Sequence, residues 1–150
     1  MRKNIHESAS NGYKIICVDD EPGVLDSLTV FLKHDGYQIT GVTDPLEAIE
    51  LVKKEHFDLM LLDFIMTPIH GDQVVEEIRK FNKELYILLL TGHKDLAPPL
   101  ETIKRLDIQG YCEKSDKFDQ SYLAEVMSSA LTMIIIDIRY KSLHAYKPFA

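Results

Sequence analysis

The 150-residue chain has no apolar run long enough to cross a membrane, since residues 85–90 and 131–138 fall far short of the ~20 residues that a bilayer requires. It also has no excess of positive charge. The net charge of −7 and the pI near 5.3 argue against a surface that binds nucleic acid directly. Residues 1–12 lack the apolar segment of a secretory signal, so we expect a flexible leader on a cytoplasmic protein.

Cysteine and glycine-rich motifs are equally scarce. The two cysteines, Cys17 and Cys112, fall inside expected strands, which favours reduced buried thiols over a disulfide. No CxxC spacing supports a zinc site. No glycine-rich loop follows the first apolar run, which disfavours a P-loop enzyme or a dinucleotide-binding protein.

Short apolar runs alternate with amphipathic stretches from residue 13 onward. This alternation predicts a single α/β domain in which strand and helix follow each other five times. Several runs are apolar at consecutive positions, as in parallel strands that are covered on both faces. The expected strands are residues 14–18, 37–42, 57–62, 85–90 and 109–113.

Each expected strand is followed by a stretch whose apolar residues recur at helical spacing. In the third helix we expect the buried residues to be Val74, Val75, Ile78 and Phe81. Proline or a capping residue marks most of the starts. Two consecutive prolines at 98 and 99 restrict the fourth helix to residues 100–106. The expected starts are Pro22, Pro45 after the Asp44 cap, Gly71, Leu100, and Asp119 or Ser121.

The pattern changes after Leu131, where residues 133–138 are apolar almost all round and therefore need cover. Three interpretations of residues 132–150 remain open. The last helix could continue and pack on the domain or on a second copy, the segment could be a linker towards an output domain, or the β-branched run could form a strand.

Polar residues directly follow four of the five expected strands. In an open parallel sheet the ligand site lies beyond the carboxyl ends of the strands, so these residues are the candidates for chemistry. Taken singly, each could also be a helix cap, a turn residue or a solvated charge. They are Asp19, Asp20, Glu21, Asp63, Thr91, Gly92 and Lys114.

The three aspartates are the core of this set. At separations of about 5 Å and a dielectric of 20, each pair of carboxylates would repel by roughly 3 kcal/mol, which calls for a cation. Oxygen ligands in a small hydrated site favour Mg²⁺. Asp63 could then accept a phosphoryl group, while Lys114 and Thr91 bind the phosphoryl oxygens and Gly92 leaves the entrance open.

These residues lie in four motifs, VDDE at 18–21, LLDFIMTPIHG at 61–71, LTGH at 90–93 and GYCEKS at 110–115. Together the motifs resemble the receiver domain of two-component response regulators, over residues 13–131. The resemblance implies a flavodoxin-like (βα)5 three-layer sandwich with a parallel sheet in the order 2-1-3-4-5.

The resemblance also implies roles for individual residues. Asp63 would take its phosphoryl group from a phosphohistidine on a sensor histidine kinase or histidine phosphotransfer protein. Asp19, Asp20 and the backbone carbonyl of Ile65 would hold Mg²⁺ together with Asp63. Tyr111 matches the aromatic switch residue, whose movement would change the face of the fourth helix, fifth strand and fifth helix; the alternative is an ordinary half-buried tyrosine. That face or the C-terminal helix could form a homodimer.

The sequence departs from the family pattern at two loops. Family members usually have a proline four residues after the phosphorylated aspartate, whereas this chain has Thr67 there and Pro68 at the next position. They also usually have a proline directly after the lysine, where this chain has Ser115. Ile65 and His93 occupy positions that flank the phosphoryl group. We predict that apolar Ile65 does not help to position water, so that the aspartyl phosphate is long-lived.

Two other functions remain open. One is a receiver that binds a protein partner without being phosphorylated. The other is a phosphohydrolase of the haloacid dehalogenase type, although that family has a second aspartate two residues after the nucleophile, where this chain has Ile65. The resemblance favours a regulatory phosphoacceptor that catalyses only its own phosphorylation and dephosphorylation.

Overall fold

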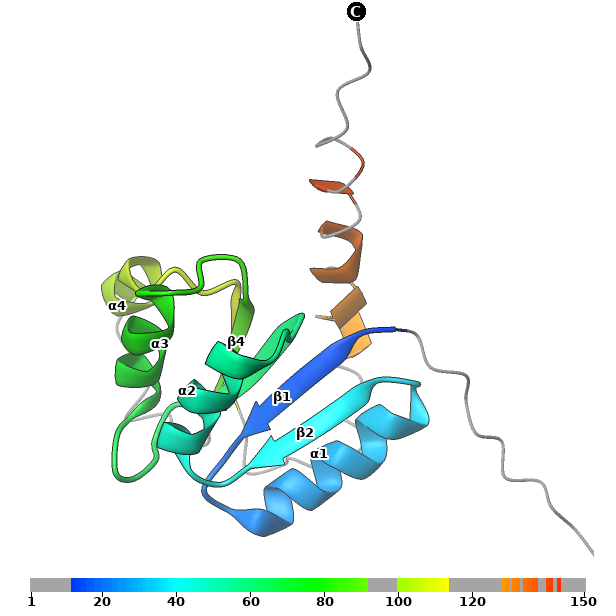
Figure 1. The fold of residues 1–150 in the computed structure, drawn as a ribbon, viewed down its shortest axis with the longest axis horizontal. Coiled ribbons are helices and arrows are strands. Elements are labelled where there is room, and N and C mark those ends of the chain that lie inside the picture. Colours follow the sequence, from blue (N-terminus) through cyan, green and yellow to red (C-terminus); the bar gives the residue numbers. More distant parts are fainter. Residues whose placement is uncertain are drawn as a thin grey trace, which may run out of the picture. The chain divides into compact units, whose positions relative to one another are not determined.

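The computed structural model describes residues 12–91 and 100–113, and residues 128–129, 131–132, 134–137, 140–141 and 143. The chain divides into two compact units, Met1–Asp116 and Lys117–Ala150. Figure 1 shows the elements of the first unit. In chain order they are β1 (Lys14–Val18), α1 (Pro22–His34), β2 (Gln38–Val42), α2 (Pro45–Lys54), β3 (Leu59–Asp63), α3 (Gly71–Arg79), β4 (Tyr86–Thr91), α4 (Leu100–Arg105) and β5 (Gly110–Glu113).

The strands form one parallel sheet in the order β2-β1-β3-β4-β5, which confirms the predicted flavodoxin-like α/β fold. β1 has the predicted bounds, and the ends of the other strands differ from the prediction by at most two residues. β3, for example, begins at Leu59, because Asp58 pairs with Lys14 partly through its side chain. The Asp58 Oδ2 atom accepts from the Lys14 backbone N–H at 2.8 Å, and the Asp58 N–H donates to the Lys14 carbonyl at 2.8 Å.

Helices cover both faces of the sheet. On one face, apolar residues of α2 and α3 pack with alternate residues of the strands, such as Ile16, Met60 and Leu89, in a single core cluster. α1 lies on the opposite face (Figure 1) and buries Leu25, Leu28 and Leu32. All five residues of β3 are buried, as expected for the central strand of a parallel sheet.

The predicted helix starts are confirmed at α1, α2 and α3. Pro22 and Pro45 lie in the first turn of their helices, where a missing N–H costs no helical bond. Asp44 Oδ1 caps α2 by accepting from the Leu46 N–H at 2.9 Å. α1 ends before Gly36, whose φ of 89° is readily adopted only by glycine.

The expected burial of α3 is correct for Val74, Val75 and Ile78 but wrong for Phe81, whose exposed fraction is 42%. α3 ends at Arg79, so Phe81 lies beyond its apolar face. The ring of Phe81 instead lies 5.5 Å from the Nζ of Lys53, a cation–π contact at the surface.

The second unit is helical at every described residue from 128 to 143. Residues 134–137 are part of this helix, so the alternative of a strand over the β-branched run is wrong. The part of the expected fifth helix before residue 128 lies outside the described residues. None of the helices within the described parts of the chain is long and apolar enough to span a membrane.

Candidate functional site

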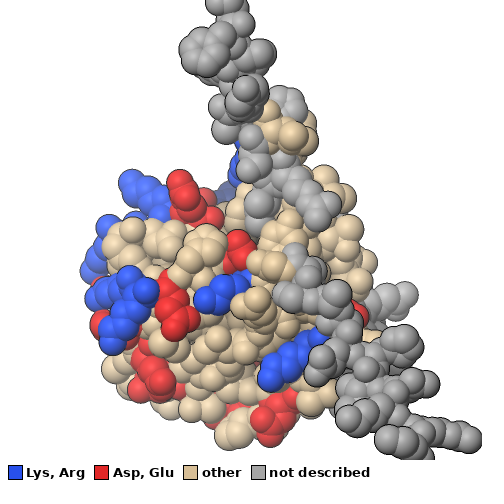
Figure 2. Space-filling model, turned by 45° about the vertical axis from the view of Figure 1, so that its right-hand side comes forward, with Lys and Arg blue, Asp and Glu red and all other residues tan. Residues whose placement is uncertain are grey.

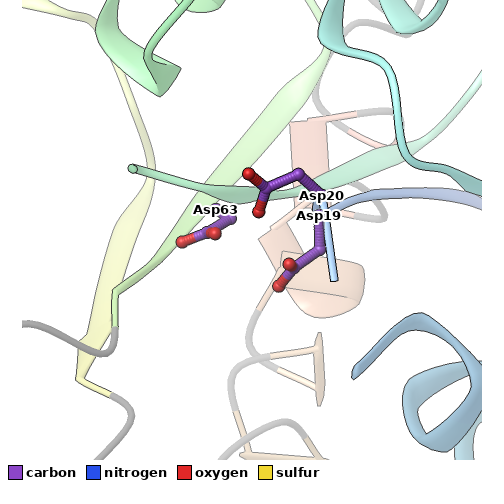
Figure 3. Close-up of side chains that lie close together, drawn as sticks. All are labelled: Asp19, Asp20 and Asp63. Carbon is purple, nitrogen blue, oxygen red and sulfur yellow. The ribbon is translucent and has the colours of Figure 1, made fainter. Parts of the chain in front are cut away.

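Three aspartates converge at the carboxyl ends of β1 and β3. Asp19 and Asp20 follow the last residue of β1, and Asp63 is the last residue of β3. Because these strands are neighbours in the sheet, the three side chains approach one another (Figure 3). One carboxylate oxygen from each lies within 4.8 Å of the others, which confirms the spatial grouping expected from the sequence.

The three carboxylates differ in their surroundings. Asp19 is only 2% exposed, and its Oδ1 atom accepts from the Glu21 backbone N–H at 2.9 Å, which fixes its orientation. Asp63 is 9% exposed, whereas Asp20 is exposed to solvent. At 4.8 Å and a dielectric of 20, two ionised carboxylates repel by about 3.5 kcal/mol. This set of hard oxygen donors therefore fits a divalent cation, which would replace mutual repulsion by attraction.

The loop after Asp63 is folded back tightly on the strand end. The Phe64 N–H donates to the Leu90 carbonyl at 2.9 Å, and the Gly71 N–H donates to the Phe64 carbonyl at 2.8 Å. The Thr67–Pro68 peptide bond within this loop is cis. Ile65 is half-buried in the same loop, directly after Phe64.

Gly71 is a site residue that the sequence analysis treated only as a helix start. A Cβ atom at this position would lie 2.7 Å from the Asp63 carbonyl oxygen and 3.0 Å from the Phe64 Cα, closer than side chains can approach backbone. Only glycine therefore lets α3 begin so close to Asp63. The signal available in the sequence was a glycine eight residues after a candidate phosphoacceptor.

The backbone register places Thr91 at the same edge of the sheet as Asp63. Asp63 pairs with Leu90, so Thr91 lies one residue beyond it at the end of β4. Thr91 in turn pairs with Glu113, the last residue of β5, which Lys114 follows in the sequence.

The remaining predicted site residues are described by their backbone alone or lie outside the described residues. Tyr111 belongs to β5 and pairs with Leu89. The side chains of Thr91 and Tyr111 lie outside the described set, as do Gly92, His93 and Lys114 altogether. The peptide bond between Lys114 and Ser115 falls in the same segment.

Cys17 adjoins the acidic cluster but takes no part in it. Its thiol is free and fully buried within β1, as the sequence analysis expected. Burial, and secondarily the negative charge of Asp19, raises the pKa of this thiol to about 12. The thiol is therefore neutral at physiological pH and acts as a small apolar core residue.

Solved structures with similar folds include response regulators. The response regulator TrrA of Thermotoga maritima, solved in complex with Mg²⁺ and BeF, is 32% identical. The match covers 79% of this chain and 98% of that one, with a TM-score of 0.65. A CheY-like receiver domain from Methanospirillum hungatei, at 21% identity, a TM-score of 0.68 and coverage of 83% and 98%, supports the fold alone.

Curated relatives include transcriptional regulators. The phosphoglycerate transport regulator PgtA of Salmonella typhimurium is 34% identical over 61% of this chain and 22% of its own length. The regulatory protein VanRc of Enterococcus gallinarum is 35% identical over 55% and 36%. The chain thus spans between about a fifth and a little over a third of these relatives. Residues 15–127 match the model of the response regulator receiver domain, and since this is well over half of the sequence, the protein belongs to that family.

Proposed function

We propose that this receiver domain accepts a phosphoryl group on Asp63 in a Mg²⁺-dependent reaction and acts as a switch in two-component signalling. The observation that supports the proposal most directly is the approach of the Asp19, Asp20 and Asp63 carboxylates to within 4.8 Å at one strand edge. A bound divalent cation would replace the mutual repulsion of these carboxylates by attraction, and a phosphoryl group could share the same cation.

In the proposed reaction, the donor is a phosphohistidine of a sensor histidine kinase or a histidine phosphotransfer protein. A carboxylate oxygen of Asp63 attacks the phosphorus as the phosphorus–nitrogen bond breaks, and the histidine nitrogen keeps the electron pair and is protonated. The product is an aspartyl phosphate. The domain catalyses its own modification and is not an enzyme that turns over other substrates.

Asp19, Asp20, Asp63 and the backbone carbonyl of Ile65 would hold the Mg²⁺. The ion, when bound, neutralises the carboxylates and the phosphoryl oxygens as they meet. The near-complete burial of Asp19 and its hydrogen bond from the Glu21 N–H would keep one ligand fixed. The exposure of Asp20 leaves the site open to water and to the partner.

Thr91 and Lys114 would bind the phosphoryl oxygens, and Gly92 would leave the entrance open. Hydrogen bonds to charged groups are worth roughly 1.5–3 kcal/mol each. Two such hydrogen bonds together would supply close to the ~5.5 kcal/mol that moves a two-state equilibrium from 1:99 to 99:1. Tyr111 would follow Thr91 inward and change the face formed by α4, β5 and the following helix.

The residues that flank the phosphoryl group would set its lifetime. Ile65 offers no hydrogen bond to an attacking water, and His93 stands at the second flanking position. We expect Ile65→Asn to shorten the half-life of the aspartyl phosphate, measured as phosphate release from the purified phosphorylated domain. An unchanged half-life would remove Ile65 from this role.

Intact mass measurement after incubation with acetyl phosphate, with and without Mg²⁺, tests the proposal. We expect a Mg²⁺-dependent phosphate adduct on the natural chain and on Asp26→Ala, an exposed aspartate of α1 outside the cluster, but none on Asp63→Ala. No adduct on any variant would favour a receiver that only binds a protein partner. Rapid turnover of phosphate monoesters would favour the phosphohydrolase, in spite of Ile65.

A second copy of the chain is the proposed partner of the C-terminal helix. Ile136, Tyr140 and Leu143 are 60%, 58% and 73% exposed, and their spacing of four and three residues puts them in one narrow stripe, the pattern of a coiled-coil seam. We expect the full chain to form a homodimer that Tyr140→Glu dissociates, as measured by sedimentation equilibrium. A monomeric natural chain would contradict this assignment. We also propose that this domain does not contact nucleic acid directly, because its net charge is −7.

A further inference from the structure

The last residue of α3, Arg79, joins two loops that are distant in the sequence. Its Nη1 atom donates to the Asn82 carbonyl at 3.2 Å, in the loop before β4. Its Nε and Nη2 atoms donate to the Asp107 carbonyl at 3.2 and 2.8 Å, in the turn between α4 and β5. The side chain is only 12% exposed. This planar fork therefore fixes the α4–β5 turn on the end of α3.

Gln109 extends the same network to the sheet. Its Oε1 atom accepts from the Ile87 N–H at 2.7 Å and lies 3.5 Å from Arg79 Nη2, while its backbone N–H donates to the Ile87 carbonyl at 3.0 Å. These bonds tie the start of β5 to β4. We call Arg79, Asn82, Asp107 and Gln109 the arginine clamp.

The turn that the clamp holds has a backbone that few residues adopt. Asp107 has a φ of 53°, the left-handed region, although it is not glycine. The carbonyl of Asp107 accepts both hydrogen bonds from the Nε and Nη2 atoms of Arg79. Arg105, by contrast, contacts Glu76 at 2.7 Å with both side chains about half exposed, a pair that water and salt screen.

We propose that the arginine clamp is the fixed anchor about which the α4–β5 part of the receiver changes conformation. The inference rests on the proposed function, because it describes how the switch moves. The clamp holds the amino-terminal ends of β4 and β5, whereas the proposed phosphoryl contacts lie at their carboxyl ends. With the turn after α4 fixed, displacement on phosphorylation grows along α4 towards Leu100 and becomes small at Leu106, whose side chain is buried in the core.

Hydrogen–deuterium exchange of the full chain tests this inference in two steps. In the unmodified protein, we expect Arg79→Met to raise amide exchange in residues 106–110 at least about tenfold. Arg79→Lys, which keeps the charge but loses the fork, should fall between the natural chain and Arg79→Met. The control Arg105→Met should change exchange there less than about twofold, because its ion pair is exposed. The lysine variant keeps the comparison valid if Arg79→Met does not fold.

Phosphorylation by acetyl phosphate and Mg²⁺ is the second step. In the natural chain we expect exchange to change in residues 100–105 and to stay constant in residues 106–110, and in Arg79→Lys the change should spread into residues 106–110. Equal exchange of natural and Arg79 variants before phosphorylation would overturn the clamp. If phosphorylation changed amide exchange in residues 106–110 of the natural chain as much as in residues 100–105, the clamp would not be an anchor. A chain that takes no phosphoryl group would overturn the proposed function and the anchor with it, while the first step still decides whether the clamp exists.

Discussion

The carboxyl end of the sheet places like charges together, whereas the amino end pairs a charge with several acceptors. At the first end, carboxylates of Asp19, Asp20 and Asp63 face one another within 4.8 Å. At the second end, the guanidinium of Arg79 is bonded to the carbonyls of Asn82 and Asp107. Both arrangements bring together residues that are distant in the sequence. Only the first would be stabilised by a bound cation.

This difference separates charges that would bind a ligand from charges that stabilise the fold. On the face shown in Figure 2, acidic and basic side chains lie beside each other rather than in patches of one sign. Pairs such as Lys80 with Glu77 and Lys53 with Glu50 follow the same rule, at 2.6 and 3.1 Å. Among the described residues, the convergence of Asp19, Asp20 and Asp63 departs from this pairing, and a divalent cation would fit the grouping.

The largest expected effect on stability is at the amino end. Arg79→Met removes a half-buried fork and leaves the Asp107 and Asn82 carbonyls without these donors, so we expect the free energy of unfolding to fall by about 2–3 kcal/mol. The matched change Arg105→Met should cost less than about 0.5 kcal/mol, because that ion pair is exposed. Urea denaturation of both variants measures the two costs. An equal loss of unfolding free energy in the two variants would show that the clamp stabilises the fold no more than the surface ion pair does.

A glycine substitution tests the packing at the carboxyl end. Gly71→Ala forces a Cβ atom to within 2.7 Å of the Asp63 carbonyl oxygen, so we expect a loss of about 1–3 kcal/mol in unfolding free energy together with weaker phosphorylation of Asp63. Gly23→Ala is the matched control, because no atom lies within 4 Å of a Cβ placed at this helical position. It should stabilise by about 0.5–1 kcal/mol. If Gly71→Ala behaved like Gly23→Ala, Gly71 would have no part in placing Asp63.

Removing one charge from the acidic cluster should act in opposite directions with and without metal. In Mg²⁺-free buffer, Asp19→Asn should raise the unfolding free energy by about 1 kcal/mol, because it relieves repulsion and keeps an acceptor for the Glu21 N–H. The same change should weaken Mg²⁺ binding at least about tenfold, measured by isothermal titration calorimetry. Asp26→Asn, outside the cluster, should change neither quantity. Undiminished Mg²⁺ affinity in Asp19→Asn would assign the ion elsewhere.

Cys17 gives no expected effect near neutral pH, because its contribution changes only in alkali. Its folded pKa of about 12 lies above the ordinary value of 9.0, so the folded chain keeps a proton that the unfolded chain releases. The contribution to stability is full below pH 9.0 and declines by about 1.4 kcal/mol per pH unit towards the folded pKa. The free energy of unfolding, measured with urea, should therefore fall less steeply between about pH 9 and pH 11 in Cys17→Ala than in the natural chain. Parallel losses in the two proteins would show that Cys17 does not titrate in this way.

Much of the fold follows from local sequence patterns. The apolar run of β3 and the prolines that begin α1 and α2 are signals that act within a few residues, and the structure has these elements where they were predicted. The acidic cluster was also predictable, because parallel neighbouring strands bring their carboxyl ends to one edge. Asp19, Asp20 and Asp63 needed only that rule.

The features that sequence reasoning missed depend on distances between elements. Arg79 meets the Asp107 carbonyl 28 residues away, and nothing in the sequence marks a carbonyl as a partner or gives Asp107 its left-handed backbone. The role of Gly71 depends on how closely α3 approaches the end of β3. Phe81 was misplaced because helical periodicity was extended two residues beyond the end of α3.

The identity of the modified residue tests the central claim most directly. The chain is incubated with acetyl phosphate and Mg²⁺ and then reduced with borohydride, which converts an aspartyl phosphate into homoserine, and its peptides are sequenced by mass spectrometry. We predict homoserine at position 63 and at no other position, and only when Mg²⁺ is present. Homoserine at position 19 or 20, or modification that is independent of Mg²⁺, would contradict the assignment of Asp63 as the phosphoacceptor.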